Sequence, residues 1–243
     1  MLQFSTWLDN LPATIDGLST SLSATLLTIW EALPYLLGGA GVTILTVAGA
    51  MSLGLLMGVP LSMAQVYGPW WMRKLGGLYV WFFRGTPILV LLFLVHFGLF
   101  GGLLGINPPA IVAAGIVLGM TSTAYQSQIF RGAIQALPQG QLKAARSLGM
   151  TTRQALQSII LPQALRISIP GWSNEYSIIL KDSALAFALG APEIMARTHF
   201  VATRTYTYLP LYITAGVLYL IITLVGLKAL RALERKVHIP GYM

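Results

Sequence analysis

Long apolar segments, each separated from the next by a shorter polar stretch, dominate the chain. Five of them approach or exceed the about 20 residues that a helix needs to cross a bilayer, and they cover residues 36–66, 77–104, 109–130, 171–191 and 210–233. The fourth is the least apolar, because it contains Asn174, Glu175, Lys181 and Asp182. This pattern predicts an all-α, polytopic membrane protein with about five transmembrane helices.

The residues before the first apolar segment allow two interpretations. Leu22, Leu26, Ile29 and Leu33 recur at helical spacing and would form the apolar stripe of a helix lying on the outer membrane interface. Alternatively, the segment is a partly ordered leader to the first span. We therefore expect an extracytoplasmic or interfacial segment over residues 1–35, a transmembrane domain over residues 36–236 and a cytoplasmic tail over residues 237–243.

Composition supports a membrane protein and suggests its orientation. Of the 243 residues 56% are hydrophobic and 9% charged, against roughly 25% charged in a soluble domain. The net charge of +8 does not indicate nucleic acid, since the basic residues form short groups beside apolar segments. Arg73, Lys74 and Arg84 lie around the first connection, and the third connection and the C-terminal end hold the others on that side. By the positive-inside rule we expect the N-terminus outside and the C-terminus in the cytoplasm.

The third connection, residues 131–170, is a polar island between two apolar segments. Pro138 is expected to open a short helix, and Gly149 stands where a left-handed cap would end it. Thr151 and Gln154 have the spacing of a capping box that starts a second helix, which Pro162 would end or kink. Two short helices around a glycine turn could dock into another protein, or they could be a solvated helical loop.

The island also resembles a known sequence signature. Lys143-Ala144-Ala145, then Gly149 four residues later, then Ile159-x-Leu161-Pro162, is similar to the loop signature of ATP-binding-cassette (ABC) importer permeases. RGTPILVLLFLVHFG at 84–98 and YQSQIFRG at 125–132 resemble segments of the polar amino acid permeases, the histidine, glutamine and arginine permease family. Lys143 and Gln128 depart from the pattern, because that family usually has Glu at both positions.

The resemblance implies a fold like that of type I ABC importer permeases in the bacterial inner membrane. Within a cytoplasmic coupling loop over residues 132–170, the helix at 139–149 would couple the protein to a separate ATPase through Gly140, Lys143, Ala144, Ala145 and Gly149. The implied partners are ATP-binding ATPase subunits, a second permease subunit (identical or different), a periplasmic amino-acid-binding protein and membrane lipid. Nucleic acid is not expected as a partner.

Charged residues inside a membrane span are candidate functional residues, because burying them there is costly. Glu175 and Asp182 are seven residues apart, on one helix face and about 10.5 Å apart along its axis. With Asn174 and Lys181 they would suit a zwitterionic substrate. Alternatively, Lys181 pairs with Asp182 or Glu175 only to hold the helices together. Arg84, just before Thr86 and Pro87, is expected near the inner interface, with a kink at Pro87.

Other chemistry is not suggested by the sequence. It contains no GxxxxGK[ST] phosphate-binding loop, so we expect a non-catalytic subunit that holds no cofactor, with ATP bound by the partner ATPase. It has no cysteine, and no metal site is expected. Two rival functions remain: a gradient-driven secondary transporter that uses Asp182 or Glu175 as its coupling site, and a membrane scaffold whose island docks a cytosolic protein.

Overall fold

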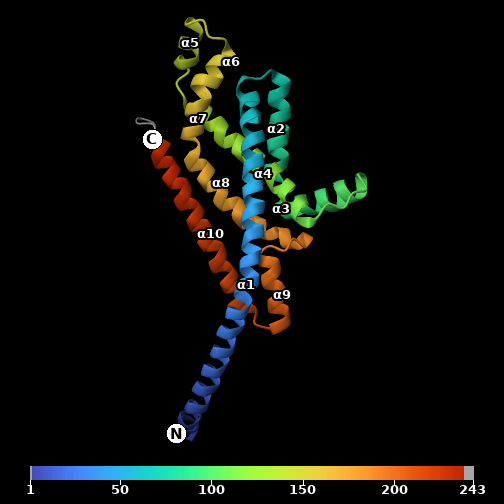
Figure 1. The fold of residues 1–243 in the computed structure, drawn as a ribbon, viewed down its shortest axis with the longest axis vertical. Helices are drawn as coiled ribbons and strands as arrows, with labels where there is room; N and C mark the ends of the chain where they lie inside the picture. Colours follow the sequence, from blue (N-terminus) through green and yellow to red (C-terminus); the bar gives the residue numbers. More distant parts are fainter. Residues whose placement is uncertain (1, 238–243) are drawn as a thin grey trace.

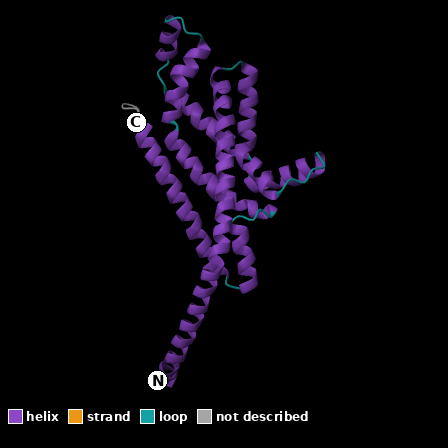
Figure 2. Ribbon diagram, in the orientation of Figure 1, coloured by secondary structure: helices purple, strands orange, loops and turns teal. Residues whose placement is uncertain are grey.

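The structure, a computed structural model, describes residues 2–237, with side-chain environments from Ser21 onward. This part of the chain consists of helices and short connections without β-strands, which agrees with the predicted all-α class (Figures 1 and 2). Residues 238–243 of the predicted cytoplasmic tail lie outside the described residues.

Helix α1 (Leu2–Tyr67) is the longest element, at 66 residues, and its N-terminal part extends beyond the other helices (Figure 1). It continues without a break past residue 35, so the stripe of Leu22, Leu26, Ile29 and Leu33 belongs to the same helix as the first apolar segment. On this stripe, Leu22 and Leu26 are 65% and 59% exposed. The functional boundary at residue 35 stays a prediction.

Helix α4 (Ala110–Ala136) packs along α1 at close range. The close approach depends on glycines in α1. A Cβ atom at Gly54 would collide with the Gln126 amide of α4, and one at Gly58 would lie 3.2 Å from the Ser127 backbone nitrogen. Small residues at helix contacts are how membrane helices approach closely without a hydrophobic driving force. The α1–α4 pair forms the centre of the bundle (Figure 1).

The second apolar segment is sharply bent. Helix α2 (Trp70–Gly85) is followed by α3 (Ile88–Phe93) and a π-helical continuation, η1 (Leu94–Leu103), and the two arms meet at 107°. Thr86 is extended (φ −98°, ψ 132°), because the ring of Pro87 excludes the helical conformation from the preceding residue. The kink expected at Pro87 is confirmed, but a single helix over 77–104 is wrong.

The fourth apolar segment is also not one long helix. Helix α8 (Ile169–Asp182) passes into a 3-10 helix, η3 (Ser183–Leu189), which ends at Gly190 with φ +86°. Helix α9 (Ile194–Thr205) and helix α10 (Tyr208–Val237) follow. Among the described residues, three helices are long and apolar enough to span a membrane: Ser21–Tyr67, Ala110–Ala136 and Tyr208–Val237. If the bent pair of α2 and α3–η1 counts as one span, the number of candidate spans rises to four. Helix α8, with 14 residues, is too short to be counted by length and composition, so this count is lower than the predicted five.

The polar island folds into helix α5 (Gly140–Ser147), helix α6 (Thr152–Ala155), a π-helical segment η2 (Leu156–Ile160) and helix α7 (Leu161–Ile167). Pro162 was expected to end or kink the second helix, and the π-helical segment η2 does end at Ile160, just before α7 begins. Pro162 lies at the start of α7, where proline's missing N–H costs no intrahelical hydrogen bond.

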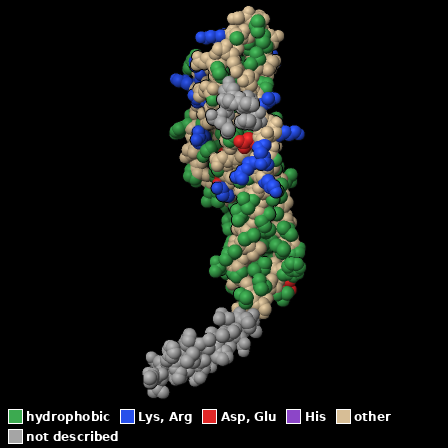
Figure 3. Space-filling model, turned by 90° about the vertical axis from the view of Figure 1, so that its left-hand side faces the viewer, with side chains coloured by type: hydrophobic (Ala, Val, Ile, Leu, Met, Phe, Trp, Pro, Cys, Tyr) green, Lys and Arg blue, Asp and Glu red, His purple; other side chains and the backbone are tan. Residues whose placement is uncertain are grey.

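The surface divides by side-chain type along the long axis. In Figure 3, Lys and Arg side chains gather in the upper part of the molecule, the end at which Figure 1 places α5, α6 and the C-terminal end of α10. Hydrophobic side chains cover the part below. Exposed large apolar residues on α10 include Leu209, Ile213, Leu224 and Val225, as expected for a helix that faces lipid or another membrane subunit.

Candidate functional site

Helix α5 ends in a hydrogen-bonded turn. Gly149 has a left-handed backbone with φ +84°. Its N–H donates to the Arg146 carbonyl at 3.0 Å, and the Met150 N–H donates to the Ala145 carbonyl at 3.1 Å. This is the Schellman arrangement, which satisfies the last carbonyl groups of a helix. The left-handed cap predicted at Gly149 is confirmed.

The start of α6 is capped as well. The Thr151 hydroxyl oxygen accepts the Gln154 N–H at 3.3 Å, and the Thr151 N–H donates to the Gln154 side-chain oxygen at 2.9 Å. The predicted capping box is therefore confirmed. The Arg146 guanidinium donates to the Thr152 hydroxyl at 2.8 Å, which joins α5 directly to α6. The caps on both sides of the turn, together with this hydrogen bond between α5 and α6, stabilise a single conformation of the turn.

An apolar cluster and an amide pair attach this unit to the bundle. The Gln141 and Gln163 side chains exchange two hydrogen bonds, at 3.1 and 3.0 Å, between α5 and α7. The cluster beneath them consists of side chains from α4 and its C-cap, from η2 and from α7: Ala133, Ile134, Leu137, Leu156, Ile160 and Ala164. These contacts attach α5 to α7, which continues into α8.

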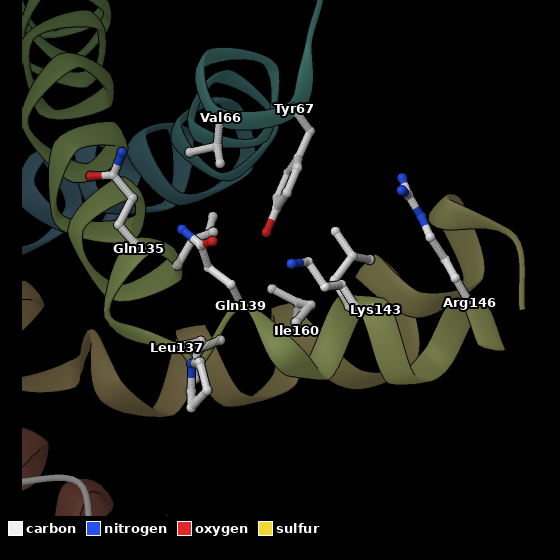
Figure 4. Close-up of a pocket in the computed structure, with 11 residues that line it drawn as sticks. Val66, Tyr67, Gln135, Leu137, Gln139, Lys143, Arg146 and Ile160 are labelled. Carbon is white, nitrogen blue, oxygen red and sulfur yellow. The ribbon is translucent and has the colours of Figure 1, made fainter. Parts of the chain in front are cut away.

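The five residues predicted for ATPase coupling lie together on α5 and its cap. Gly140, Lys143, Ala144 and Gly149 are exposed, whereas Ala145 is only 2% exposed. Ala145 therefore supports α5 from beneath and offers no surface to a partner. In Figure 4 the Lys143 side chain reaches into a pocket between α5 and the end of α1.

The sequence analysis did not identify Leu148 as a candidate functional residue. Leu148 follows the last residue of α5, and its side chain is 83% exposed. A single exposed leucine is ordinary by itself. Its position at the capped tip of α5, however, makes it the apolar side chain that a docking partner would meet first. The helix composition around it contained no signal that distinguishes a buried from an exposed leucine.

A second polar site lies inside the bundle, where Glu175 of α8 meets α4. The Ser122 hydroxyl donates to the Glu175 carboxylate at 3.1 Å, and the Glu175 side chain is 1% exposed. The Gln126 amide nitrogen donates to Ser122 at 2.9 Å and to the Met51 carbonyl of α1 at 3.0 Å. The Trp172 indole N–H donates to the Gln126 oxygen at 2.8 Å. This network, the buried junction, connects α1, α4 and α8.

The four residues predicted for the substrate path have different environments. Glu175 is buried in the junction, Asp182 is half-buried, and Asn174 and Lys181 are exposed. In the part of the chain that the structure describes, no salt bridge joins Lys181 to Asp182 or Glu175, but the Lys181 charge acts on Asp182. The substrate role and the structural role of Lys181 both stay predictions. Asp182 does lie within electrostatic range of Glu175.

The position expected for Arg84 near the inner interface stays a prediction. Arg84 lies in the last turn of α2, about 21 Å along the helix from Trp70 at the α1–α2 turn. Its guanidinium carbon lies 4.8 Å from the centre of the Tyr125 ring, and its charge acts on Glu175. Arg84 thus lies at the opposite end of α2 from Arg73 and Lys74, a separation that the sequence alone did not indicate.

The polar residues of α4 were also missed as a set. Ser122 and Gln126 are four residues apart on one helix face, and both are fully buried. Gln128, one of the departures from the family pattern, donates from its amide nitrogen to the Gln65 oxygen of α1 at 2.8 Å. The signal was present, since so many polar side chains inside an apolar segment indicate contacts between helices.

At the opposite end of the bundle from α5, Glu193 caps helix α9. Its carboxylate accepts the Met195 and Ala196 N–H groups, both at 2.7 Å, and the Tyr219 hydroxyl of α10. Burial raises the pKa of the Glu193 carboxyl, an effect that these three hydrogen bonds oppose. Glu193 therefore ties α9 to α10, a role that no sequence motif indicated.

Known proteins match this chain over most of its length. The family model described as binding-protein-dependent transport system inner membrane component matches residues 50–239. The probable amino-acid ABC transporter permease protein YckA of Bacillus subtilis (strain 168) is 34% identical over 206 residues, which are 85% of this chain and 90% of that protein. The arginine transport system permease protein ArtQ of the same organism is 33% identical over 207 residues, covering 84% of this chain and 93% of ArtQ.

A solved structure agrees with these matches. The structure described as an amino acid ABC transporter with histidines superposes with a TM-score of 0.78 at 33% identity, and covers 86% of this chain and 97% of the matched chain. The gradient-driven alternative gains no support from any of these similarities. The residues that the family model matches, 50–239, begin within α1 and extend past the last residue of α10, Val237. The chain therefore belongs to the family of inner membrane components of binding-protein-dependent transport systems.

Proposed function

We propose that this chain is the permease subunit of an ABC importer for polar amino acids, and that it binds its ATPase through α5. The observation that carries the proposal is the capped and anchored α5 unit, because a short rigid helix attached to the bundle can convert movement of a docked protein into movement of α8. Family membership and relatives named as amino-acid permeases support the same conclusion.

The partner ATPase supplies the energy in this proposal. ATP binds to the partner, and this chain holds no cofactor. The exposed face of α5, with Gly140, Ala144 and Leu148, enters a groove on the ATPase. To swing the permease fully between inward-facing and outward-facing states, ATP-driven closure must favour one of them by about 5.5 kcal/mol.

A second permease subunit, identical or different, completes the substrate path. Asn174 and Lys181 are exposed on α8 in the single chain, and polar side chains at membrane depth are costly against lipid. We therefore place this face of α8, together with half-buried Asp182, against the second subunit and the path. The buried junction around Glu175 sets the position of that face from behind.

The orientation follows from the distribution of charge. The basic end of the molecule, which carries α5, faces the cytoplasm, and the loops around α9 and at residues 104–109 face outward. A periplasmic amino-acid-binding protein delivers substrate to that outer end. The N-terminal segment of residues 1–35 belongs to the outer side, and the C-terminus belongs to the cytoplasm.

Reconstitution into proteoliposomes tests the proposal. We expect uptake of labelled histidine, glutamine or arginine only when the permease, an ATPase, ATP and a binding protein are all present. Asp182→Asn is expected to change uptake while leaving the complex assembled. Uptake that proceeds without any ATPase and stops when a protonophore removes the proton gradient would overturn the proposal.

A further inference from the structure

A pocket of about 510 Å³ lies between the C-terminal end of α1 and the α4–α5 connection, with α5 as one wall (Figure 4). Val66 and Tyr67 form the α1 side, and Gln139 and Lys143 lie on the α5 side. The amine of Lys143 and the hydroxyl of Tyr67 point into the same space (Figure 4). The pocket is therefore distinct from the tip of α5, where Leu148 is exposed.

The polar groups of the pocket favour an anion. Lys143 is accompanied by Arg146 at the rim, and among the described residues that line the pocket none is acidic. The Lys143 ammonium group thus faces the pocket without a carboxylate beside it. Amine, guanidinium, phenol and amide groups all donate hydrogen bonds, which suits a phosphate oxygen better than a cation or a neutral sugar.

The remaining lining is apolar. Ile134, Leu137 and Ile160 are between 2% and 5% exposed and belong to the cluster under α5. A free inorganic ion would gain nothing from such a floor. A ligand that carries a phosphate beside hydrocarbon can satisfy the basic rim and cover the apolar floor at once.

The pocket also lies at the level of the membrane surface. Trp70 and Trp71 begin α2 directly after the short turn that follows the pocket residue Tyr67, and they are 66% and 50% exposed. Exposed tryptophans at the end of a spanning helix mark the headgroup region. The Lys74 amine lies 5.5 Å from the centre of the Trp70 ring, which adds a second positive charge at this level.

We propose that the pocket binds the headgroup of an anionic phospholipid, with its phosphodiester between Lys143 and Tyr67. Basic pockets beside membrane helices on the cytoplasmic side bind anionic headgroups in this way. The lipid fills the space between α1 and α5 and stabilises the position of α5. Lys143 therefore acts on the lipid rather than on the surface that Leu148 presents.

Native mass spectrometry of the full chain in detergent, without an ATPase, tests the proposal. Phosphatidylglycerol, phosphatidylcholine and inorganic phosphate are titrated in separate arms. We expect tight adducts with phosphatidylglycerol alone, and about fivefold weaker binding for Lys143→Gln, the loss of one basic residue near a headgroup. Lys143→Arg should restore binding, and Tyr67→Phe should weaken it about two- to tenfold.

Arg166→Gln is the matched control, because Arg166 is exposed on α7 and does not line the pocket. Equal weakening by Lys143→Gln and Arg166→Gln would show non-specific attraction and overturn the proposal. Equal binding of phosphatidylcholine, or inorganic phosphate that competes at the same concentration, also overturns it. In a second experiment, Lys143 is labelled with an amine-reactive reagent in the presence of either the ATPase or phosphatidylglycerol. Protection by the ATPase but not by phosphatidylglycerol would also overturn the proposal, because it would indicate that an acidic side chain of the ATPase occupies the pocket. The lipid titrations contain no ATPase. Their outcome therefore does not depend on whether α5 binds an ATPase, as proposed above.

Discussion

The hydroxyl of Ser122 in α4 donates a hydrogen bond to the carboxylate of Glu175 in α8, at 3.1 Å and inside the bundle. Glu175 is 1% exposed, so this bond is shielded from solvent and lipid. Through Gln126 the same network reaches the backbone of α1. Three helices that are far apart in the sequence are thus fixed together behind the α8 face that we assign to the substrate path.

Glu175→Gln should preserve this junction, because its amide oxygen can still accept the Ser122 hydrogen bond. Glu175→Ala should lower the thermal midpoint in detergent by about 5 to 10 °C, from a lost hydrogen bond and a cavity that together cost about 2 to 3 kcal/mol. Scanning fluorimetry of both variants measures this. Equal midpoints for Ala and Gln would show that the junction contributes nothing to stability.

Gly54 permits the contact between α1 and α4 that the junction requires. Gly54→Ala should destabilise the protein by about 1 to 3 kcal/mol, because the new methyl group displaces the Gln126 amide. Gly49→Ala in the same helix is the control, since nothing lies within 4 Å of its Cβ position. Thermal unfolding that is alike for the two variants would contradict the close α1–α4 contact.

Gly149 sets the shape of the turn after α5. Gly149→Val should weaken ATPase binding about 5- to 30-fold, because a left-handed backbone costs a residue with a Cβ about 1 to 2 kcal/mol and a β-branched one more. Gly132→Ala, a helical position with open space around it, should bind normally. Affinity is measured by titrating immobilised permease with the ATPase, and unchanged affinity of Gly149→Val counts against a docking role for α5.

Glu193 and Tyr219 should be energetically coupled. Glu193→Ala removes the cap of α9, worth about 0.5 to 2 kcal/mol, and leaves the Tyr219 hydroxyl without its carboxylate partner. In a double-mutant cycle with Tyr219→Phe we expect a coupling energy of about 1 to 3 kcal/mol in unfolding free energy. Strictly additive effects would mean that this bond does not hold α9 against α10.

Local signals in the sequence predicted the elements that depend on neighbouring residues. Gly149, Thr151 and Gln154 define their turn through hydrogen bonds within a few residues, so their roles were predictable without the fold. The kink at Pro87 was predictable for the same reason. Its 107° angle was not, because the bend depends on what α3 and η1 pack against.

Residues that act through distant partners could not be placed from the sequence. Glu175 was recognised as a buried charge, but its partner Ser122 lies 53 residues away and its neighbours in space come from three helices. The distance of Arg84 from the α1–α2 turn could not be predicted, because it depends on where α2 begins. Leu148 was missed since exposure depends on the surroundings of a helix rather than on its composition.

The central claim is that the tip of α5 enters a groove of a partner ATPase, and site-specific cross-linking tests it most directly. The chain has no cysteine, so Leu148→Cys and, as a control at the opposite end of the molecule, Thr207→Cys each introduce a single thiol. With the ATPase that supports uptake in reconstitution, a short bifunctional thiol–amine reagent should join the ATPase to Leu148→Cys and not to Thr207→Cys. Equal cross-linking of both variants, or none at Leu148→Cys in a complex that transports, would contradict the account.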